Sequence, residues 1–421
     1  MLQHVRSGSW PLQAMVIVSS GLLFGHTIGA QAFGSRSPWC NGVCGKDAGP
    51  KPTGTSSRRS LHQRVGCPKG KGHPTAETMT NAALGTDARC VHDLTGTARS
   101  AKLGKMNLSL SEFELIERYF ASATMRREDV LAGIGDDAAL LQVLPHHDVV
   151  SAITTLVEGV HFQPGTHPRS VGHRVLAIAL SRLAATGATP AWATLSLVLP
   201  EADEAWLAPF SSGFVQLAER HQVQLVGGDT VRGPLTVTVA TTGFVPMGQA
   251  LDRGGARVGN LIYVTGTLGE AALALLAENG SIHPPTKIRA QFQARLDAPE
   301  PRVAEGRRLA GLATAATDLP DGLAAGLREL LESSALGATV YASQLPLSAQ
   351  SALWLPAAGG QDLLLHGGGD YELCFTIPSD KQAELEVAFS SLKGHCNWIG
   401  MVEKTPGLRC VFEDGAVNCL W

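Results

Sequence analysis

The sequence predicts an α/β (α+β layered) protein of two domains, and three observations lead to this prediction. Segments with strand-like alternation and segments with helical periodicity follow one another from about residue 106 to the end of the chain. A Gly-rich stretch, GGARVGN at 254–260, separates these segments into two halves of similar rhythm. With 421 residues, 44% hydrophobic and 17% charged, the chain has the composition and length of a globular protein with more than one core. The predicted domains are residues 106–256 and 257–421.

The first half opens with a predicted helix, because Ser111 and Glu114 form a capping-box pattern before apolar residues at helical spacing. The other elements of this half are predicted from alternating or periodic apolar runs. They are strands at 148–157, 192–200, 222–228 and 234–245, and helices at 168–187 and 203–221.

The second half follows the same rules. A strand is predicted at 261–266, where Gly266 and Gly269 then turn the chain, and a helix at 270–278. The later segments are helices near 303–315 and 322–333, a strand at 372–377, a helix at 380–392 and a strand near 397–403.

Residues 1–105 differ from this pattern. They are rich in Gly, Ser, Thr and Pro, carry 13 Lys/Arg against 4 Asp/Glu, and lack sustained periodicity. One segment, MVIVSSGLLFGHTIGAQAF, has features of a signal peptide, with Arg6 before it and Ala30-Gln31-Ala32 as a cleavage-like site. The interpretation we favour is a disordered leader, or sequence translated from upstream of the true start.

Charge, hydropathy and cysteine content argue against several classes of protein. Residues 106–421 carry 21 Lys/Arg against 33 Asp/Glu, whereas phosphate contacts to nucleic acid require clustered basic residues. The one apolar leader segment is too short and broken to span a membrane. Eight scattered cysteines, among them a lone Cys40/Cys44 pair, form no disulfide framework or zinc pattern. The sequence therefore predicts a cytoplasmic protein with reduced thiols and neither a nucleic-acid nor a membrane partner.

Four acid-bearing turns are the main functional signal. In each, an Asp lies beside Gly at the end of a predicted strand or helix: GIGDDAALL (133–141), LVGGDTVRG (225–233), ATDLPDGL (316–323) and HGGGDYELCF (366–375). A single turn of this kind is usually an Asx turn or a helix cap. Four of them on an acidic chain favour a hard cation such as Mg²⁺, which takes oxygen ligands and bridges substrate phosphates. Asp318 and Asp321, three residues apart, are predicted to lie together at a helix entrance.

Other catalytic signatures are missing from the sequence. It contains no G-x-x-x-x-G-K-[ST] phosphate loop, no Rossmann G-x-G-x-x-G, no G-x-S-x-G elbow and no H-E-x-x-H helix. Outside the acids, His161 and Arg253 are the best polar candidates. A single His at a strand end is more often structural, whereas an Arg beside two glycines suits anion binding.

The order of the motifs resembles the bacterial thiamine-monophosphate kinase family, a branch of the aminoimidazole ribonucleotide synthetase-like (PurM-like) group. The resemblance runs from about Phe113 to Trp421 and depends on eleven motifs in sequence. They are GIGDDAAL, TLVEGVHF, LAATGA, PAW, GGDTVRGPL, GFVPMG, DRGGA, YVTGTLG, PEPR, D-x-x-DGL and GGGDYELCFT.

This resemblance implies a PurM-like N-terminal domain that forms a β-barrel across a homodimer, and an α/β C-terminal domain. It implies ATP-dependent phosphorylation of thiamine monophosphate to thiamine diphosphate with several Mg²⁺ ions. The implied site residues are the metal ligands Asp137, Asp229, Asp318 and Asp321, the nucleotide contacts Gly228, Asp229 and Arg253, and the substrate contact His161. Asp136 is assigned a structural role.

Four ligand positions depart from the family pattern, and Asn260 in the segment before YVTG is a milder departure. Thr154 and Arg182 stand where the family has metal-binding Asp residues, Pro320 replaces a Ser that contacts ATP, and Gly369 replaces a substrate-binding Glu. The substitutions predict a weakened reaction. The alternative is a non-catalytic relative that binds nucleotide or thiamine phosphate, and a third reading is a sister enzyme such as selenide, water dikinase. TLVEGVHF and GGDTVRGPL favour the thiamine branch.

Overall fold

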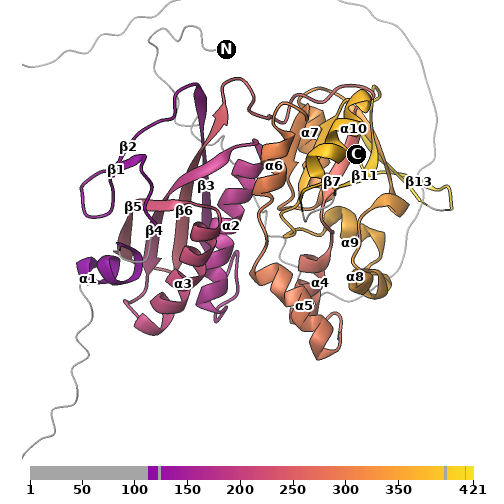
Figure 1. Ribbon diagram of the computed structural model, residues 1–421. Helices are drawn as coiled ribbons and strands as arrows, with labels where there is room; N and C mark the ends of the chain where they lie inside the picture. Colours follow the sequence, from indigo (N-terminus) through magenta and orange to yellow (C-terminus); the bar gives the residue numbers. More distant parts are fainter. Residues whose placement is uncertain (1–111, 122–124, 393–395, 413) are drawn as a thin grey trace, which may run out of the picture. The chain divides into compact units, whose positions relative to one another are not determined.

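The structure is a computed structural model that describes residues 112–121, 125–392, 396–412 and 414–421 (Figure 1). The leader, residues 1–105, and the predicted capping residue Ser111 lie outside these ranges. The described chain begins with α1 (Glu112–Ile116) and the π-helical turn η1 (Glu117–Ala121). A search of the described helices finds none whose length and apolarity would let it span a bilayer.

The first half of the described chain contains a four-stranded sheet of order β3-β6-β4-β5. Its strands are β3 (His147–Val157), β4 (Thr189–Leu199), β5 (Gln224–Arg232) and β6 (Thr236–Pro246). β4 and β5 are parallel, and the other neighbours are antiparallel. A small hairpin, β1 (Val130–Ala132) with β2 (Leu140–Leu141), precedes them. The four predicted strands of this half are confirmed, although β5 extends four residues beyond its predicted end.

Two helices cover one face of this sheet, α2 (Pro168–Ala185) and α3 (Glu204–Arg220) (Figure 1). α2 begins with Pro at its first position, and the Asp203 side chain caps α3 by accepting the Ala205 N–H at 2.9 Å. The helices pack closely because each presents a glycine to the other: a Cβ at Gly172 would lie 2.2 Å from a backbone oxygen of α3, and one at Gly213 2.1 Å from a backbone oxygen of α2. Both predicted helices are confirmed.

The opposite face of the sheet is only partly covered by the described residues: the β1-β2 hairpin packs on one end of it, against Trp192 and Phe244, and the rest is exposed. Residues alternate along β3, with Leu156 buried while Val149 and Ile153 remain 50% and 48% exposed. Polar threonines share the open face, and Thr155 Oγ1 lies 2.9 Å from Thr238 Oγ1 on β6. The sheet therefore presents a mixed apolar and hydroxyl surface on the side that α2 and α3 leave uncovered.

A seven-stranded sheet of order β13-β12-β9-β11-β7-β10-β8 forms the second half. Its strands are β7 (Leu261–Thr265), β8 (Ala315–Asp318), β9 (Gly337–Tyr341), β10 (Leu373–Ile377), β11 (Cys396–Glu403), β12 (Gly407–Val411) and β13 (Val417–Cys419). The helices of this half are α4 (Glu270–Glu278), α5 (Thr286–Asp297), α6 (Val303–Leu309), α7 (Leu323–Glu332), α8 (Ala349–Trp354), α9 (Gln361–His366) and α10 (Gln382–Phe389). Three short 3-10 turns, at Ala342–Gln344, Pro356–Ala358 and Ser379–Lys381, complete it.

One helix of the second half is wrong as predicted. The segment near 303–315 was expected to be helical throughout, but α6 ends at Leu309 and Ala315–Asp318 forms β8. Between them Gly311 adopts φ +78°, which a right-handed helix does not allow. Strand pairing with β10 therefore overrides the helical propensity of this Ala-rich segment.

The two halves are joined through buried apolar contacts as well as through the chain. One continuous core contains Leu176 and Leu180 of α2 together with Leu309 of α6 and Phe375 of β10. Helix α2 thus lies between the four-stranded sheet and the second half, and its last turn reaches the loops at the end of β8 and before β10. These loops carry several of the predicted site residues.

Candidate active site

The turn after β8 carries Asp318 and Asp321. Asp318 is the last residue of the strand and is only 2% exposed, so its predicted place at a helix entrance is wrong. Burial raises the pKa of Asp318 to about 6, although the positive charges of Arg182 and Arg253 oppose the rise. Asp321 lies in the following turn at the surface, yet loss of solvent on its inner side raises its pKa too, against the charge of Arg182. The two acids therefore have different environments but share Arg182.

This turn is held against the segment that leads into β10. The Leu319 N–H donates to the Glu372 carbonyl at 2.9 Å, and the Gly369 N–H donates to the Pro320 carbonyl at 2.8 Å. These backbone bonds bring the D-x-x-DGL and GGGDYEL motifs together. Pro320 and Gly369, two of the four departures from the family pattern, are thus direct hydrogen-bonding neighbours.

The other two departures, Thr154 and Arg182, meet on the opposite side of the same region. Arg182 lies in the last turn of α2, and its Nη1 donates a hydrogen bond to the carbonyl of Ile153 on β3. Thr154 follows directly on that strand, is 5% exposed, and its Oγ1 has no hydrogen-bond partner in the described part of the chain. The Arg182 side chain therefore reaches the β3 backbone directly before Thr154. Its positive charge also opposes the raised pKa of Asp318 and of Asp321.

Asp137 and Asp229 belong to a second group, around the edge strand β5. Both carboxylates are exposed, Asp137 in the bend after the β1 hairpin strand and Asp229 within β5. The hairpin packs on the sheet through Val130 and Leu141, which contact the cluster containing Val226 of β5. The acid-bearing loop is therefore anchored beside the strand that carries Asp229.

Gly228 is required by the close approach of β4. A Cβ at this position would lie 1.8 Å from the carbonyl oxygen of Leu195, with which Gly228 pairs in the parallel ladder. No side chain larger than hydrogen fits there without displacing the strand. Gly228 is itself exposed, so the backbone beside Asp229 is accessible to a ligand.

Arg253 and His161 occupy separate loops. The Arg253 guanidinium forms a 3.1 Å ion pair with Glu329 of α7 and remains half-exposed. His161 is exposed in the loop after β3, and its Nδ1 accepts the Val157 N–H at 3.0 Å, so Nε2 is the ring nitrogen left for another partner. A small hollow of about 210 Å³ is lined by residues 248–252, which precede Arg253 in the chain, and by Gly255, Gly311, Ala313 and Thr314.

The predicted metal ligands do not form one cluster. Among the described residues, no group of three or more His, Cys, Asp or Glu side chains is arranged to hold a metal ion. The charges near Asp318 come instead from Arg182 and Arg253, which oppose the rise in its pKa. The sequence predictions of Asp137, Asp229, Asp318 and Asp321 as ligands stay predictions. The unpartnered Oδ2 of buried Asp318 is nevertheless an oxygen that a cation would satisfy.

The sequence reasoning missed a buried charge cluster beside this site. Glu372, fully buried, accepts hydrogen bonds from Arg302 at 2.5 and 2.6 Å, from Arg295 at 2.9 Å and from the Thr265 hydroxyl at 2.7 Å. Burial opposes the charge on Arg302, but the hydrogen bonds and attraction of Glu372 more than offset it and raise the pKa of Arg302. Arg302 in the PEPR motif and Glu372 in the DYEL motif can both be found in the sequence, but neither motif indicates that the two side chains form a pair.

Asp370 and Tyr371 lie in the chain between Gly369, which is bonded to the Asp318–Asp321 turn, and Glu372 of the buried charge cluster. Asp370 caps α4 from a distance in sequence, accepting the N–H groups of Gly269 at 2.7 Å and Ala271 at 3.3 Å, and burial raises its pKa to about 7. Tyr371 has φ +51°, an unusual value for a residue with a side chain, and its carbonyl accepts the Ser181 hydroxyl of α2 at 3.1 Å. The turn before β10 is therefore fixed to both α4 and α2.

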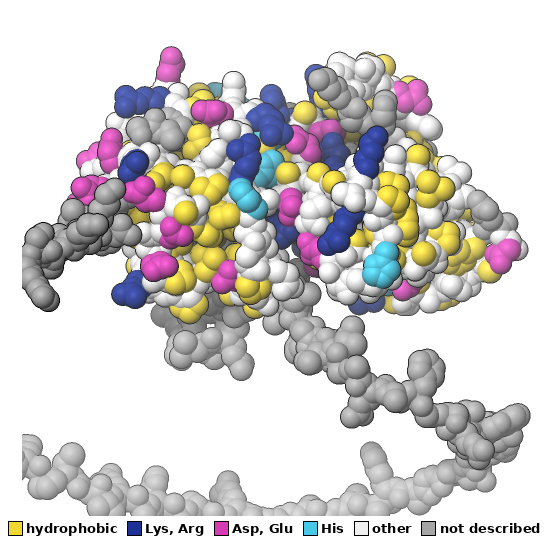
Figure 2. All heavy atoms as spheres, turned by 90° about the horizontal axis from the view of Figure 1, so that it is seen from below, with side chains coloured by type: hydrophobic (Ala, Val, Ile, Leu, Met, Phe, Trp, Pro, Cys, Tyr) yellow, Lys and Arg dark blue, Asp and Glu magenta, His cyan; other side chains and the backbone are white. Residues whose placement is uncertain are grey.

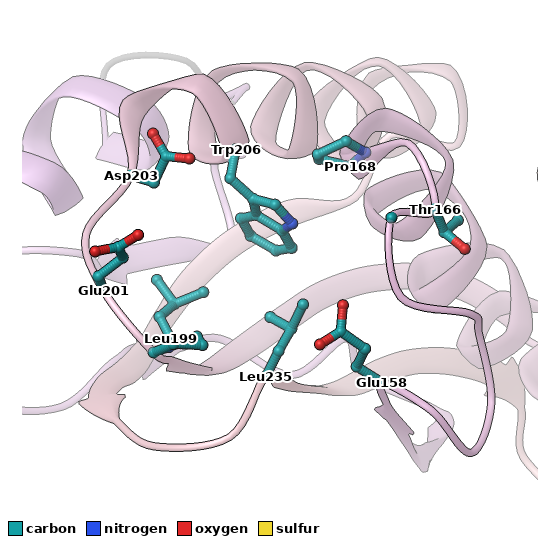
Figure 3. Close-up of a pocket in the computed structure, with 10 residues that line it drawn as sticks. Glu158, Thr166, Pro168, Leu199, Glu201, Asp203, Trp206 and Leu235 are labelled. Atoms are coloured by element: carbon teal, nitrogen blue, oxygen red, sulfur yellow. The ribbon is translucent and has the colours of Figure 1, made fainter.

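A separate pocket of about 310 Å³ lies between the loop after β3 and the start of α3 (Figure 3). The Trp206 ring projects into it above Leu199 and Leu235, and Glu158 faces the ring from the opposite side. It contains none of the predicted site residues.

In the view from below, Lys, Arg and His side chains gather near the middle of the face, between areas of exposed hydrophobic side chains (Figure 2). Asp and Glu side chains lie beside them, so the charge in this area is mixed (Figure 2).

The comparisons with known proteins first define the class. The sequence model "AIR synthase related protein, N-terminal domain" matches residues 135–245, and "AIR synthase related protein, C-terminal domain" matches residues 257–413. The two-domain PurM-like α/β fold is thus confirmed. Hydrogenase maturation protein HypE of E. coli shares the fold with a TM-score of 0.60 at 18% identity, over 73% of this chain and 96% of that one.

The chain belongs to the thiamine-monophosphate kinase family. It is 41% identical to thiamine-monophosphate kinase of Escherichia coli strain K12 over 309 residues, which cover 73% of this chain and 95% of the relative. The crystal structure of thiamine-monophosphate kinase from Stenotrophomonas maltophilia K279a matches with 43% identity and a TM-score of 0.67, over 73% of this chain and 98% of that one. A structure described as AaThiL complexed with AMPPCP and TMP matches with 27% identity and a TM-score of 0.58, over 72% and 94%.

Proposed function

We propose that this protein is an ATP-dependent phosphotransferase that converts thiamine monophosphate to thiamine diphosphate. The observation that carries the proposal is its match, at 41% identity over nearly the full length of the relative, to thiamine-monophosphate kinase of E. coli. A structural neighbour described as complexed with AMPPCP and TMP supports a site for a nucleotide together with a second ligand. The reaction belongs to thiamine diphosphate biosynthesis.

The proposed binding roles follow the two groups of acids. Asp137 and Asp229 would hold Mg²⁺ at the edge of β5, where exposed Gly228 leaves the backbone accessible to the nucleotide phosphates. Asp318 and Asp321 are the remaining proposed ligands, and the unpartnered Oδ2 of Asp318 fits a cation. Bound Mg²⁺ would neutralise phosphate charge, which is the main electrostatic demand of phosphoryl transfer.

The chain's own side chains would position the two substrates. Arg253, half-exposed and directly after the residues 248–252 that line the hollow, would meet the nucleotide, and the free Nε2 of His161 would meet the thiamine substrate. Correct placement supplies a large part of the rate enhancement in reactions of this type. Thr154, Pro320 and Gly369 offer no carboxylate to a metal ion or substrate, so we expect a slow reaction.

A second function is favoured by Arg182. A guanidinium that faces Asp318 and Asp321 brings positive charge to the place where a second pair of ligands would meet a metal ion. A protein that binds nucleotide and thiamine phosphate without phosphoryl transfer would tolerate this charge. The two functions share their ligands and differ only in turnover.

We further propose that the protein acts as a homodimer in the cytoplasm. The open face of the four-stranded sheet exposes Val149 and Ile153, and a second copy packed on it would cover them. The four described cysteines, Cys374, Cys396, Cys410 and Cys419, are free thiols, which suits a reducing compartment.

The test is product formation. Purified protein is incubated with ATP, Mg²⁺ and thiamine monophosphate, and thiamine diphosphate is separated by chromatography. Asp229→Asn should abolish the product while Asp380→Asn, an equal charge change at an exposed helix start, should leave it unchanged. If thiamine diphosphate never forms but both ligands raise the melting temperature, the binding function replaces the kinase.

A further inference from the structure

One corner of the site contains Thr154, Arg182, Asp318 and Asp321, and we call it the Arg182 corner. Arg182 is fixed there from two sides. Its guanidinium donates to the Ile153 carbonyl on β3, and the preceding Ser181 hydroxyl ties α2 to the Tyr371 carbonyl at 3.1 Å. The positive charge is therefore held at the end of α2 rather than carried by a free surface side chain.

The buried acid of this corner, Asp318, lacks a partner that a buried oxygen normally has. Asp318 is 2% exposed, and among the described residues its Oδ2 accepts no hydrogen bond. Thr154 Oγ1, also buried, is unpartnered as well. Buried polar atoms without partners are costly and uncommon. The Oδ2 of Asp318 is thus an oxygen that a cation would satisfy.

The counter-charge already present comes mainly from one residue. Helix α2 packs against β8, and among the described residues Arg182 opposes the raised pKa of Asp318 more than Arg253 does and is the one positive group that opposes the raised pKa of Asp321. Arg253 also acts on Asp318, but it is paired with Glu329 at 3.1 Å. A guanidinium cannot lose its proton in a protein and has no atom that coordinates a metal ion.

We infer that Arg182 is the resident cation of this corner, supplying the positive charge that Asp318 and Asp321 would otherwise take from a divalent ion. A divalent ion entering beside it meets repulsion in a partly buried place, where charges are poorly screened. The corner therefore binds Mg²⁺ weakly, whereas the exposed pair Asp137 and Asp229 remains available. The inference rests on the proposed function only in assigning Asp318 and Asp321 as metal ligands.

The test measures ion binding alone, so that it does not depend on catalysis. The full chain, without nucleotide, is titrated with Mn²⁺, and free Mn²⁺ is followed by its electron paramagnetic resonance signal. Arg182→Met removes the charge and keeps much of the apolar stem. It should bind Mn²⁺ at least about tenfold more tightly than the unmodified protein. Adding Asp318→Asn to that variant should cancel the gain.

Two further variants separate charge from shape. Arg182→Lys keeps the positive charge and should bind Mn²⁺ as weakly as the unmodified protein. Arg169→Met, an equal charge loss at the other end of α2, where Arg169 contacts Ser212 and Gln216, should have no effect. Melting curves confirm that each variant is folded.

Three outcomes would overturn the inference. In the first, folded Arg182→Met shows no tighter Mn²⁺ binding. In the second, Arg182→Lys gains as much as Arg182→Met. In the third, the unmodified protein already holds a tight Mn²⁺ that Asp318→Asn removes. Loss of thiamine diphosphate formation would leave the inference intact, because no arm of this test measures turnover.

Discussion

Replacement of Glu372 by Gln is the perturbation for which the structure gives the clearest magnitude. Glu372 is fully buried and accepts from Arg302 at 2.5 and 2.6 Å and from Arg295 at 2.9 Å, and these side chains are 15% and 25% exposed. The amide keeps the shape but removes the charge, and it turns one accepting oxygen into a donor that faces other donors.

Removing one partner of a buried ion pair costs about 3–5 kcal/mol, because the remaining charge stays buried without compensation. For a chain of this size each kcal/mol corresponds to roughly 2 °C in melting temperature, so Glu372→Gln should melt roughly 6–10 °C lower. The segment from Gly369 to Tyr371 precedes Glu372 directly, so ligand binding at the D-x-x-DGL turn should weaken as well.

The assay is thermal unfolding followed by circular dichroism, with the refolded fraction checked after cooling. Glu204→Gln serves as the matched control, because it breaks the Arg118–Glu204 pair of 3.0 Å between half-exposed side chains. Such a pair contributes little, and its loss should move the melting temperature by less than about 2 °C. If Glu372→Gln melts as close to the unmodified protein as Glu204→Gln does, the buried cluster does not stabilise the fold and the reasoning is refuted.

Three further predictions follow from single positions. Gly228→Ala places a Cβ 1.8 Å from the Leu195 carbonyl, so β5 must shift and urea unfolding should show a loss of about 1–3 kcal/mol, and unchanged stability would contradict the close approach. Thr154→Val replaces an unpartnered buried hydroxyl by a methyl group, so urea unfolding should show equal or higher stability, by up to about 1 kcal/mol, and a clear loss would reveal a hidden partner. Asp370, with a pKa raised to about 7, holds its proton longer when folded than when unfolded, so its contribution to stability is complete below about pH 4 and is lost as the pH rises to about 7. Comparison of urea unfolding at pH 5 and pH 8 should show a smaller decrease for Asp370→Asn than for the unmodified protein, and an equal decrease would contradict this assignment.

The alternation of strands and helices could be predicted from the sequence because most elements carry a strong local pattern. Helix α2 has Pro at its start and a continuous apolar face, and β3 alternates cleanly. β8 could not be predicted, since its Ala-rich sequence favours a helix and only pairing with β10 makes it a strand. β9 is short and its partners β11 and β12 lie far away in the sequence, whereas β12 and β13 are short strands that pair with each other as a local hairpin.

For the site, sequence reasoning located the acid-bearing turns but not their environments. It expected Asp318 and Asp321 to share one helix entrance, whereas one is buried at a strand end and the other lies at the surface. It identified Arg182 as a cation at a ligand position. The structure adds that its guanidinium donates to the Ile153 carbonyl and that its charge acts on Asp318. The Glu372 cluster was missed because its partners come from two segments far from it in the sequence, Thr265 and the stretch with Arg295 and Arg302, which only the folded chain brings together.

The most direct test of the central claim is a single-turnover experiment with ATP labelled at the γ-phosphate. Protein in excess over labelled ATP, with Mg²⁺ and saturating thiamine monophosphate, is quenched over a range of times, and the label is followed by chromatography. The proposed kinase predicts that the label passes from ATP into thiamine diphosphate, slowly but to completion, and that omission of thiamine monophosphate prevents the transfer. If the label stays in ATP while both ligands remain bound, or leaves only as inorganic phosphate, the protein does not catalyse this transfer and the assignment as a kinase is contradicted.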